Sequence, residues 1–156
     1  MQTTAVPRAL AALLQILQED PGLTTATVID GPPVQDLSAS DLVVVGWTPV
    51  GDEPVAESSQ DFAYAGARTR TEDFTLSGWA ESWSGEQDFA TRRARAYELL
   101  AVIETALRAT AAQPEAPTLL GTVQWAHLTG HRLQQLLTDQ GARVGIAWTV
   151  SCHARL

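Results

Sequence analysis

The spacing of apolar side chains predicts two helices. In residues 6–19, apolar positions recur at intervals of three and four, which places them on one stripe of a helix. The same period recurs over residues 86–111, where Ser84 and Gln87 fit a capping box at the start of a second, longer helix. The expected buried stripe of that longer helix consists of Phe89, Ala96, Leu100, Ile103 and Leu107.

Strands are predicted between and after these helices. Residues 27–30 form a short apolar run, and residues 41–47 form a continuous one, which is typical of a strand covered on both faces. Residues 62–83 are expected to be mainly extended. Within them, Phe74 and Leu76 alternate with polar neighbours, so these two share one strand face.

The last part of the chain predicts a hairpin. Residues 119–137 form its first arm, with a kink expected at Gly130, and residues 139–141 form the turn. The second arm alternates between apolar and other positions up to Arg155. The order helix, strands, long helix, strands predicts an α+β fold, in which two main helices pack on one face of a mostly antiparallel sheet.

Composition is consistent with one globular domain spanning residues 1–156, because 45% of the chain is hydrophobic and 18% is charged. The net charge is −8 and there is no lysine, so a grip on nucleic acid is not expected. The densest basic stretch is Arg92, Arg93 and Arg95, and a solvated helix face explains it better than a nucleic-acid contact. No apolar run approaches the ~18 residues that a membrane span needs, so no membrane partner is expected.

Residues 48–61 are expected to form an acidic loop inserted into this domain. Pro49, Gly51 and Pro54 interrupt regular structure, and the segment contains no base. Its four acids are candidates for a surface that faces a partner or the lumen of an assembly. They are Asp52, Glu53, Glu57 and Asp61.

Candidate catalytic and metal-binding residues are few. His127 and His131 have the spacing of metal ligands only on a helix, whereas the surrounding pattern predicts a strand. Cys152 and His153 are adjacent on a strand, so their side chains point to opposite faces and do not activate one another. We therefore expect no catalytic residues, no metal and no cofactor.

The tryptophans are more informative. Trp79 and Trp83 lie on the strand face opposite Phe74 and Leu76, so both indoles point away from the core if the latter face the helices. Exposed indoles mark an interaction surface, because tryptophan is a favoured interface anchor. The alternative is that the acidic segment folds over them.

Three stretches of the chain together resemble the tail terminator, or tail completion, proteins of long-tailed phages. The first is the N-terminal helix followed by Val28-Ile29-Asp30-Gly31-Pro32 and Leu42-Val43-Val44-Val45-Gly46. The second is residues 66–76, then Ser84-Gly85 and a long helix that opens with Phe89-Ala90-Thr91-Arg92-Arg93-Ala94. The third is residues 138–146 and the alternating final strand. The acidic stretch 48–61 has no counterpart in that pattern.

The resemblance implies a structural virion protein without catalytic activity. Such proteins assemble as a ring, commonly a hexamer, on the tail tube, stop its growth and meet the head-tail connector protein. DNA passes through the ring without specific binding, which an acidic chain favours. The implied location is the head-tail junction of a virion, after synthesis in the host cytoplasm.

The same resemblance makes Arg68, Arg70 and Glu72, with Trp79 and Trp83, candidates for a subunit or tube interface. Two other interpretations stay open. One is another neck or connector subunit, and the other is a small-molecule enzyme or binding module built on an α+β sheet.

Overall fold

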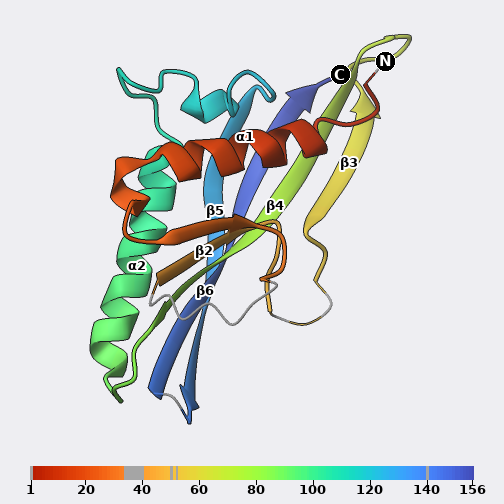
Figure 1. The fold of residues 1–156 in the computed structure, drawn as a ribbon. Coiled ribbons are helices and arrows are strands. Elements are labelled where there is room, and N and C mark those ends of the chain that lie inside the picture. The colour runs from red at the N-terminus through yellow and green to blue at the C-terminus, as the bar shows by residue number, and fades with distance from the viewer. Residues whose placement is uncertain (1, 34–40, 50, 52, 140) are drawn as a thin grey trace.

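The computed structural model describes residues 2–33, 41–49, 51, 53–139 and 141–156. Two helices cover one face of a six-stranded sheet, which confirms the predicted α+β fold (Figure 1). The helices are α1 (Val6–Glu19) and α2 (Phe89–Ala106). The strands are β1 (Thr27–Asp30), β2 (Asp41–Val45), β3 (Ala56–Phe62), β4 (Arg70–Trp83), β5 (Trp125–Thr138) and β6 (Gly141–Arg155). Neither helix is long and apolar enough, within the described residues, to cross a membrane.

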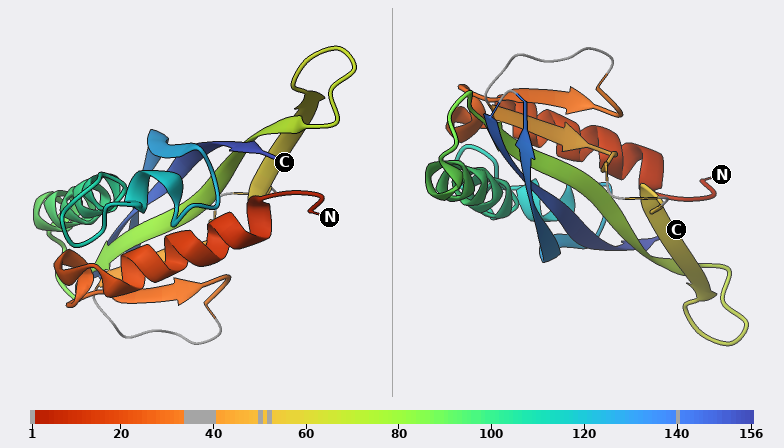
Figure 2. Two further views of the ribbon diagram at one scale, coloured as in Figure 1. Left: turned by 90° about the horizontal axis from the view of Figure 1, so that it is seen from above. Right: turned by 90° about the horizontal axis from the view of Figure 1, so that it is seen from below.

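The sheet is built around two long strands, β4 and β6. Its order is β1-β2-β4-β6-β5, and among the strands of the described residues only β1 and β2 run parallel to one another. One edge of β4 is shared, because β2 pairs with its residues 78–82 and β3 pairs with its residues 70–76. The β3–β4 hairpin therefore extends beyond the part of the sheet that the helices cover, as an arm (Figure 2).

The core lies between the helices and the sheet. The apolar residues of α1 and α2 pack there against alternate residues of β2, β4 and β6, which include Phe74, Leu76 and Trp148. Trp148 fits because Gly78 faces it from β4, and a Cβ at Gly78 would lie 2.0 Å from the indole. The strand alternation read from the sequence is therefore the one that fills the core.

The long helix is shorter than predicted at both ends. It begins after Asp88, whose carboxylate accepts a hydrogen bond from the Thr91 N–H at 3.1 Å, so the capping box proposed at Ser84 is wrong. The Ser84 N–H donates instead to the Ala142 carbonyl, and the Glu86 carbonyl accepts from the Ala142 N–H at 2.9 Å. Residues 84–86 thus lie along the start of β6, bonded to it through the backbone, and are not part of the helix.

The acidic segment also differs from the prediction, because most of its second half belongs to strand β3 and is not a loop. Backbone pairing with β4 aligns Glu57 with Thr75 and Asp61 with Thr71. The seven residues of β3 are polar except at its two ends, so the apolar pattern that indicates a strand was missing.

The terminal hairpin is present as predicted, but β5 starts at Trp125 and not at 119. Before it, a short helical turn (Ala116–Thr118) is followed by Leu119 and Leu120, both in the left-handed backbone region with φ of 45° and 58°. Leu119 is fully buried, so its side chain holds this turn in the core. A β-bulge lies between Leu128 and Gly130, at the position of the expected kink.

Candidate functional site

The face of the sheet that carries no helix holds most of the residues expected to meet partners. A second apolar cluster lies on it, formed by Leu42, Val44, Trp79 and Ala147, with Ile29 and Trp47 packed against them. Trp79 is on the predicted face but is only 4% exposed. Its indole lies against Gly145, where a Cβ would approach the ring to 1.9 Å.

The chain itself thus covers Trp79. The apolar cover comes from the β1–β2 edge and Trp47, and no described residue of the acidic segment, the expected alternative, belongs to this cluster. Trp83 is half-buried, and the Arg143 guanidinium lies 6.0 Å from the centre of its ring. The indole N–H of Trp83 is buried and has no hydrogen-bond partner among the described residues. The assignment of both tryptophans to a subunit interface stays a prediction.

Glu81 and Arg143 flank this tryptophan pair. Their side chains approach to 3.6 Å between Oε1 and Nε. Burial raises the pKa of Glu81, and the charge of Arg143 opposes that rise. Because Glu81 pairs with Gly145 and Arg143 with Trp83 across β4 and β6, one ion pair and two indoles occupy neighbouring positions on this face.

The structure separates the three charged candidates of the arm. Arg68 is exposed, and the Arg70 guanidinium donates to the Gln60 side chain at 2.9 Å. Glu72 is fully buried, so its carboxylate is not available on the surface of the isolated chain. It accepts hydrogen bonds from the Ala5 N–H at 2.7 Å and the Ser58 hydroxyl at 2.6 Å, and further ones from Thr4 and Gln60.

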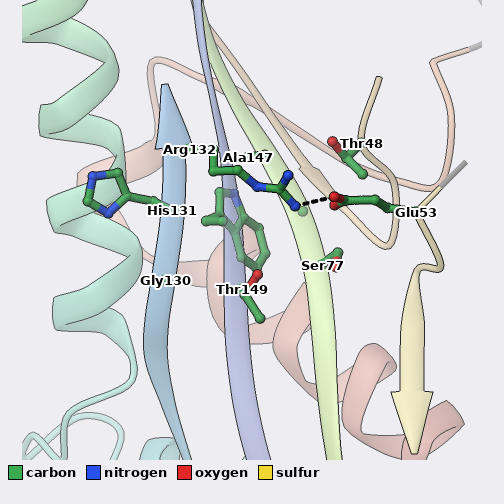
Figure 3. Close-up of a pocket in the computed structure, with 10 residues that line it drawn as sticks. Thr48, Glu53, Ser77, Gly130, His131, Arg132, Ala147 and Thr149 are labelled. Carbon is green, nitrogen blue, oxygen red and sulfur yellow. Dashed lines mark hydrogen bonds and ion pairs between the residues drawn. The ribbon is translucent and has the colours of Figure 1, made fainter. Parts of the chain in front are cut away.

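The three acidic candidates that the structure describes do not gather at one place. Glu57 and Asp61 are exposed on β3, on the helix-free side. Glu53 precedes that strand and forms an ion pair with Arg132 of β5 (Figure 3). Asp52 lies outside the described residues.

Glu53 and Arg132 border a cavity of about 210 Å³ on the same face. Thr48, Ser77 and Thr149 contribute hydroxyl groups to its wall. His131 belongs to the lining only through its backbone region, because its ring points toward α2, where it lies 3.2 Å from the Tyr97 hydroxyl (Figure 3). Among the described residues, the cavity therefore holds an ion pair and hydroxyls but no imidazole that could act as their base.

The β-bulge explains the placement of the histidines. His127 pairs with Ser151 on the helix-free face, whereas His131, after the bulge, pairs with Trp148 and faces α2. The two rings lie on opposite faces and do not share a metal. Within the described residues, no three His, Cys, Asp or Glu side chains are grouped as metal ligands.

Cys152 and His153 point to opposite faces, as predicted. Cys152 is buried in the core, and burial raises the pKa of its thiol to about 12. His153 faces the other side, where its Nδ1 lies 2.7 Å from the Asp73 carboxylate and its ring stacks on Trp125. Sequence reasoning missed this His153–Asp73–Trp125 group, because only the register of three paired strands brings these residues together.

Comparison with known proteins identifies the fold. No model of a known protein family matches the chain, and no curated protein matches its sequence. A chain in the structure of a "virion of native gene transfer agent (GTA) particle" is similar to it, with a TM-score of 0.54 and 15% sequence identity. The match covers 99% of this chain and 100% of that one, so the two share one fold over their whole length.

Proposed function

We propose that this chain is a non-enzymatic structural subunit of a phage-like particle. The observation that carries the proposal is the fold shared, from end to end, with a chain of a gene transfer agent virion. The candidate site agrees with a structural role, since its exposed features are apolar side chains and charges on strand surfaces. These are the groups from which protein assemblies build interfaces.

Within such a particle, the function we propose is that of a tail terminator. The chain would form a ring, with six copies as the expected number, on the last ring of the tail tube protein. It would stop tube growth and offer its other side to the head-tail connector protein. The three sequence stretches that resemble tail terminators support this position at the head-tail junction.

The charge of the chain supports a conduit for DNA. At a net charge of −8, a ring of these subunits repels the phosphate backbone overall, so DNA can pass without adhering. Glu57 and Asp61 are exposed and belong to the helix-free face, which makes that face the candidate lumen or partner side.

The test measures the mass of the assembly that the chain forms and its effect on the length of tail tubes. Purified full-length chain, measured by light scattering over a concentration series, is expected to form a closed species of fixed mass that negative-stain electron microscopy shows as a ring. Added to polymerising tail tube protein from the same particle, it is expected to shorten the tubes and to appear at one end of each. A ring that leaves tube length unchanged but binds the connector protein would instead identify another neck subunit. A chain that stays monomeric and binds neither partner would contradict the proposal.

A further inference from the structure

The most exposed large apolar side chains lie at two opposite ends of the molecule. Phe62 and Tyr64, at the tip of the β3–β4 arm, are 63% and 69% exposed. Leu136 and Leu137, beside the β5–β6 turn, are 56% and 60% exposed. Single exposed apolar residues need no explanation, but two pairs, each on a hairpin end, indicate two contact surfaces.

The exposed charges at these two ends are mostly of opposite sign: the arm end carries more arginines than acids, with Asp61 as its exposed acid beside Phe62. Arg68 and Arg155 border one cavity of about 560 Å³ with Phe62 at the arm end. Both are exposed, and among the described arginines theirs are the only guanidinium groups with neither a hydrogen bond nor an ion pair. Basic groups without a partner, beside exposed aromatic rings, fit an acidic and apolar surface.

The opposite end of the sheet offers such a surface. Asp139 lies in the β5–β6 turn and is exposed. Glu86 is also exposed, and its carbonyl accepts from the Ala142 N–H, which places it beside the same turn. Of the arginines near this turn, Arg143 lies against the acidic Glu81, whereas Arg93 donates to the neutral Gln135 and keeps its charge.

One chain cannot bring its own two ends together. Strand β6 runs from Gly141 at the turn end to Arg155 at the arm end, and its fifteen residues span roughly 45 Å at the rise of a strand. If two copies met arm to arm, Arg68 and Arg155 of one copy would lie against the equivalent arginines of the other, and the like charges would repel. A contact between the arm of one copy and the turn end of the next joins unlike charges and buries both apolar pairs.

We propose that the chain associates head to tail with a second copy, through the arm end (Phe62, Tyr64, Arg68, Arg155) and the turn end (Glu86, Leu136, Leu137, Asp139). This inference rests on the proposed ring and assigns the contact that builds it. A contact between unlike ends leaves one end free on each outermost copy. Further copies can therefore be added until the first and last copies meet and close the ring.

Charge reversal tests the contact. The variant R68E/R155E makes the arm end acidic, and the variant E86R/D139R makes the turn end basic. Each variant alone is expected to associate at least ten-fold more weakly than the unchanged chain in sedimentation or light scattering at low salt. A one-to-one mixture of the two is expected to associate again, because each arm then meets a turn end of opposite charge.

The exchanged pair E104R/R108E is the matched control, because it reverses a surface ion pair at the C-terminal end of α2, away from both ends of the sheet. It is expected to associate like the unchanged chain, and thermal melting of all variants checks that they fold. Rings that persist in both reversed variants would overturn the head-to-tail contact and leave the proposed function standing. Failure of the mixture to associate, although each variant alone is weakened, would also overturn it. An unchanged chain that caps tubes but never associates by itself would assign the two ends to the tube protein and overturn the self-contact.

Discussion

At the scale of single residues, Glu72 shows how a charge is kept inside the fold. Burial by itself raises the pKa of this carboxyl, but the hydrogen bonds from Ala5, Ser58, Thr4 and Gln60 outweigh burial and lower the pKa below its usual range. These donors come from the start of α1 and from β3. The carboxylate thus fastens the arm and the first helix to β4, and the sequence had indicated an interface acid instead.

The lowered pKa predicts a dependence of stability on pH. Because the folded-state pKa lies below the unfolded one, the contribution of Glu72 is complete above about pH 4.3, the ordinary pKa of a glutamate, and is lost as the pH falls through the folded value. Glu72→Gln is expected to lower the free energy of unfolding at neutral pH by about 1–3 kcal/mol. It should also lose less stability than the unchanged chain between roughly pH 5 and pH 3. Urea unfolding at both pH values measures this, with the exposed Glu57→Gln as control. Parallel losses in the Glu72→Gln variant and the unchanged chain would refute the linkage.

At the scale of secondary-structure elements, β4 and β6 are locked together by two indoles that lie on glycines. Trp148 packs on Gly78 on the helix side, and Trp79 packs on Gly145 on the other side. Gly78→Ala and Gly145→Ala each force a ring to move, and each is expected to cost about 1–3 kcal/mol of unfolding free energy. Gly130→Ala is the control, because a Cβ there meets nothing within 4 Å. Chemical denaturation that ranks Gly130→Ala as the most damaging of the three would contradict this packing.

The elements that the sequence predicted well are those whose apolar residues recur at the helix or strand spacing along the whole element. Residues 6–19 were predicted as a helix and form α1, and the alternation from Val144 to Ala154 is the buried face of β6. The strand β3 was missed because its stability comes from pairing with β4 and from polar contacts to Glu72, which leave no apolar pattern. The cover over Trp79 was missed for a related reason, since strands far apart in sequence supply it.

At the scale of the whole molecule, the sheet separates two faces and two ends. One face is closed by the helices, and the other carries the second apolar cluster and the exposed acids of β3. At the ends, Arg68 and Arg155 lie at the arm end and Asp139 and Glu86 lie beside the turn. The sequence singled out Arg68 and the acidic segment as candidates, but it could not show how they lie relative to the turn end. That relation depends on β4 and β6 running the full length of the sheet, which brings residues 62–70 to one end and residues 136–139 to the other.

The leucines at the turn end give a prediction that separates assembly from folding. Leu136 and Leu137 are more than half exposed in the isolated chain, so Leu136→Ser with Leu137→Ser is expected to change the free energy of unfolding by only about 0.5 kcal/mol. Burial of a leucine side chain in a contact contributes about 1.5–3 kcal/mol, and about 1.4 kcal/mol corresponds to a ten-fold change in affinity. The double variant is therefore expected to self-associate at least ten-fold more weakly, measured by sedimentation across a concentration series, with little change in melting.

Tyr97→Ser, which removes an exposed ring from the middle of α2, serves as the control and should associate normally. Normal association of the double serine variant, or a large loss of its melting temperature, would show that these leucines serve the fold and not the contact between copies.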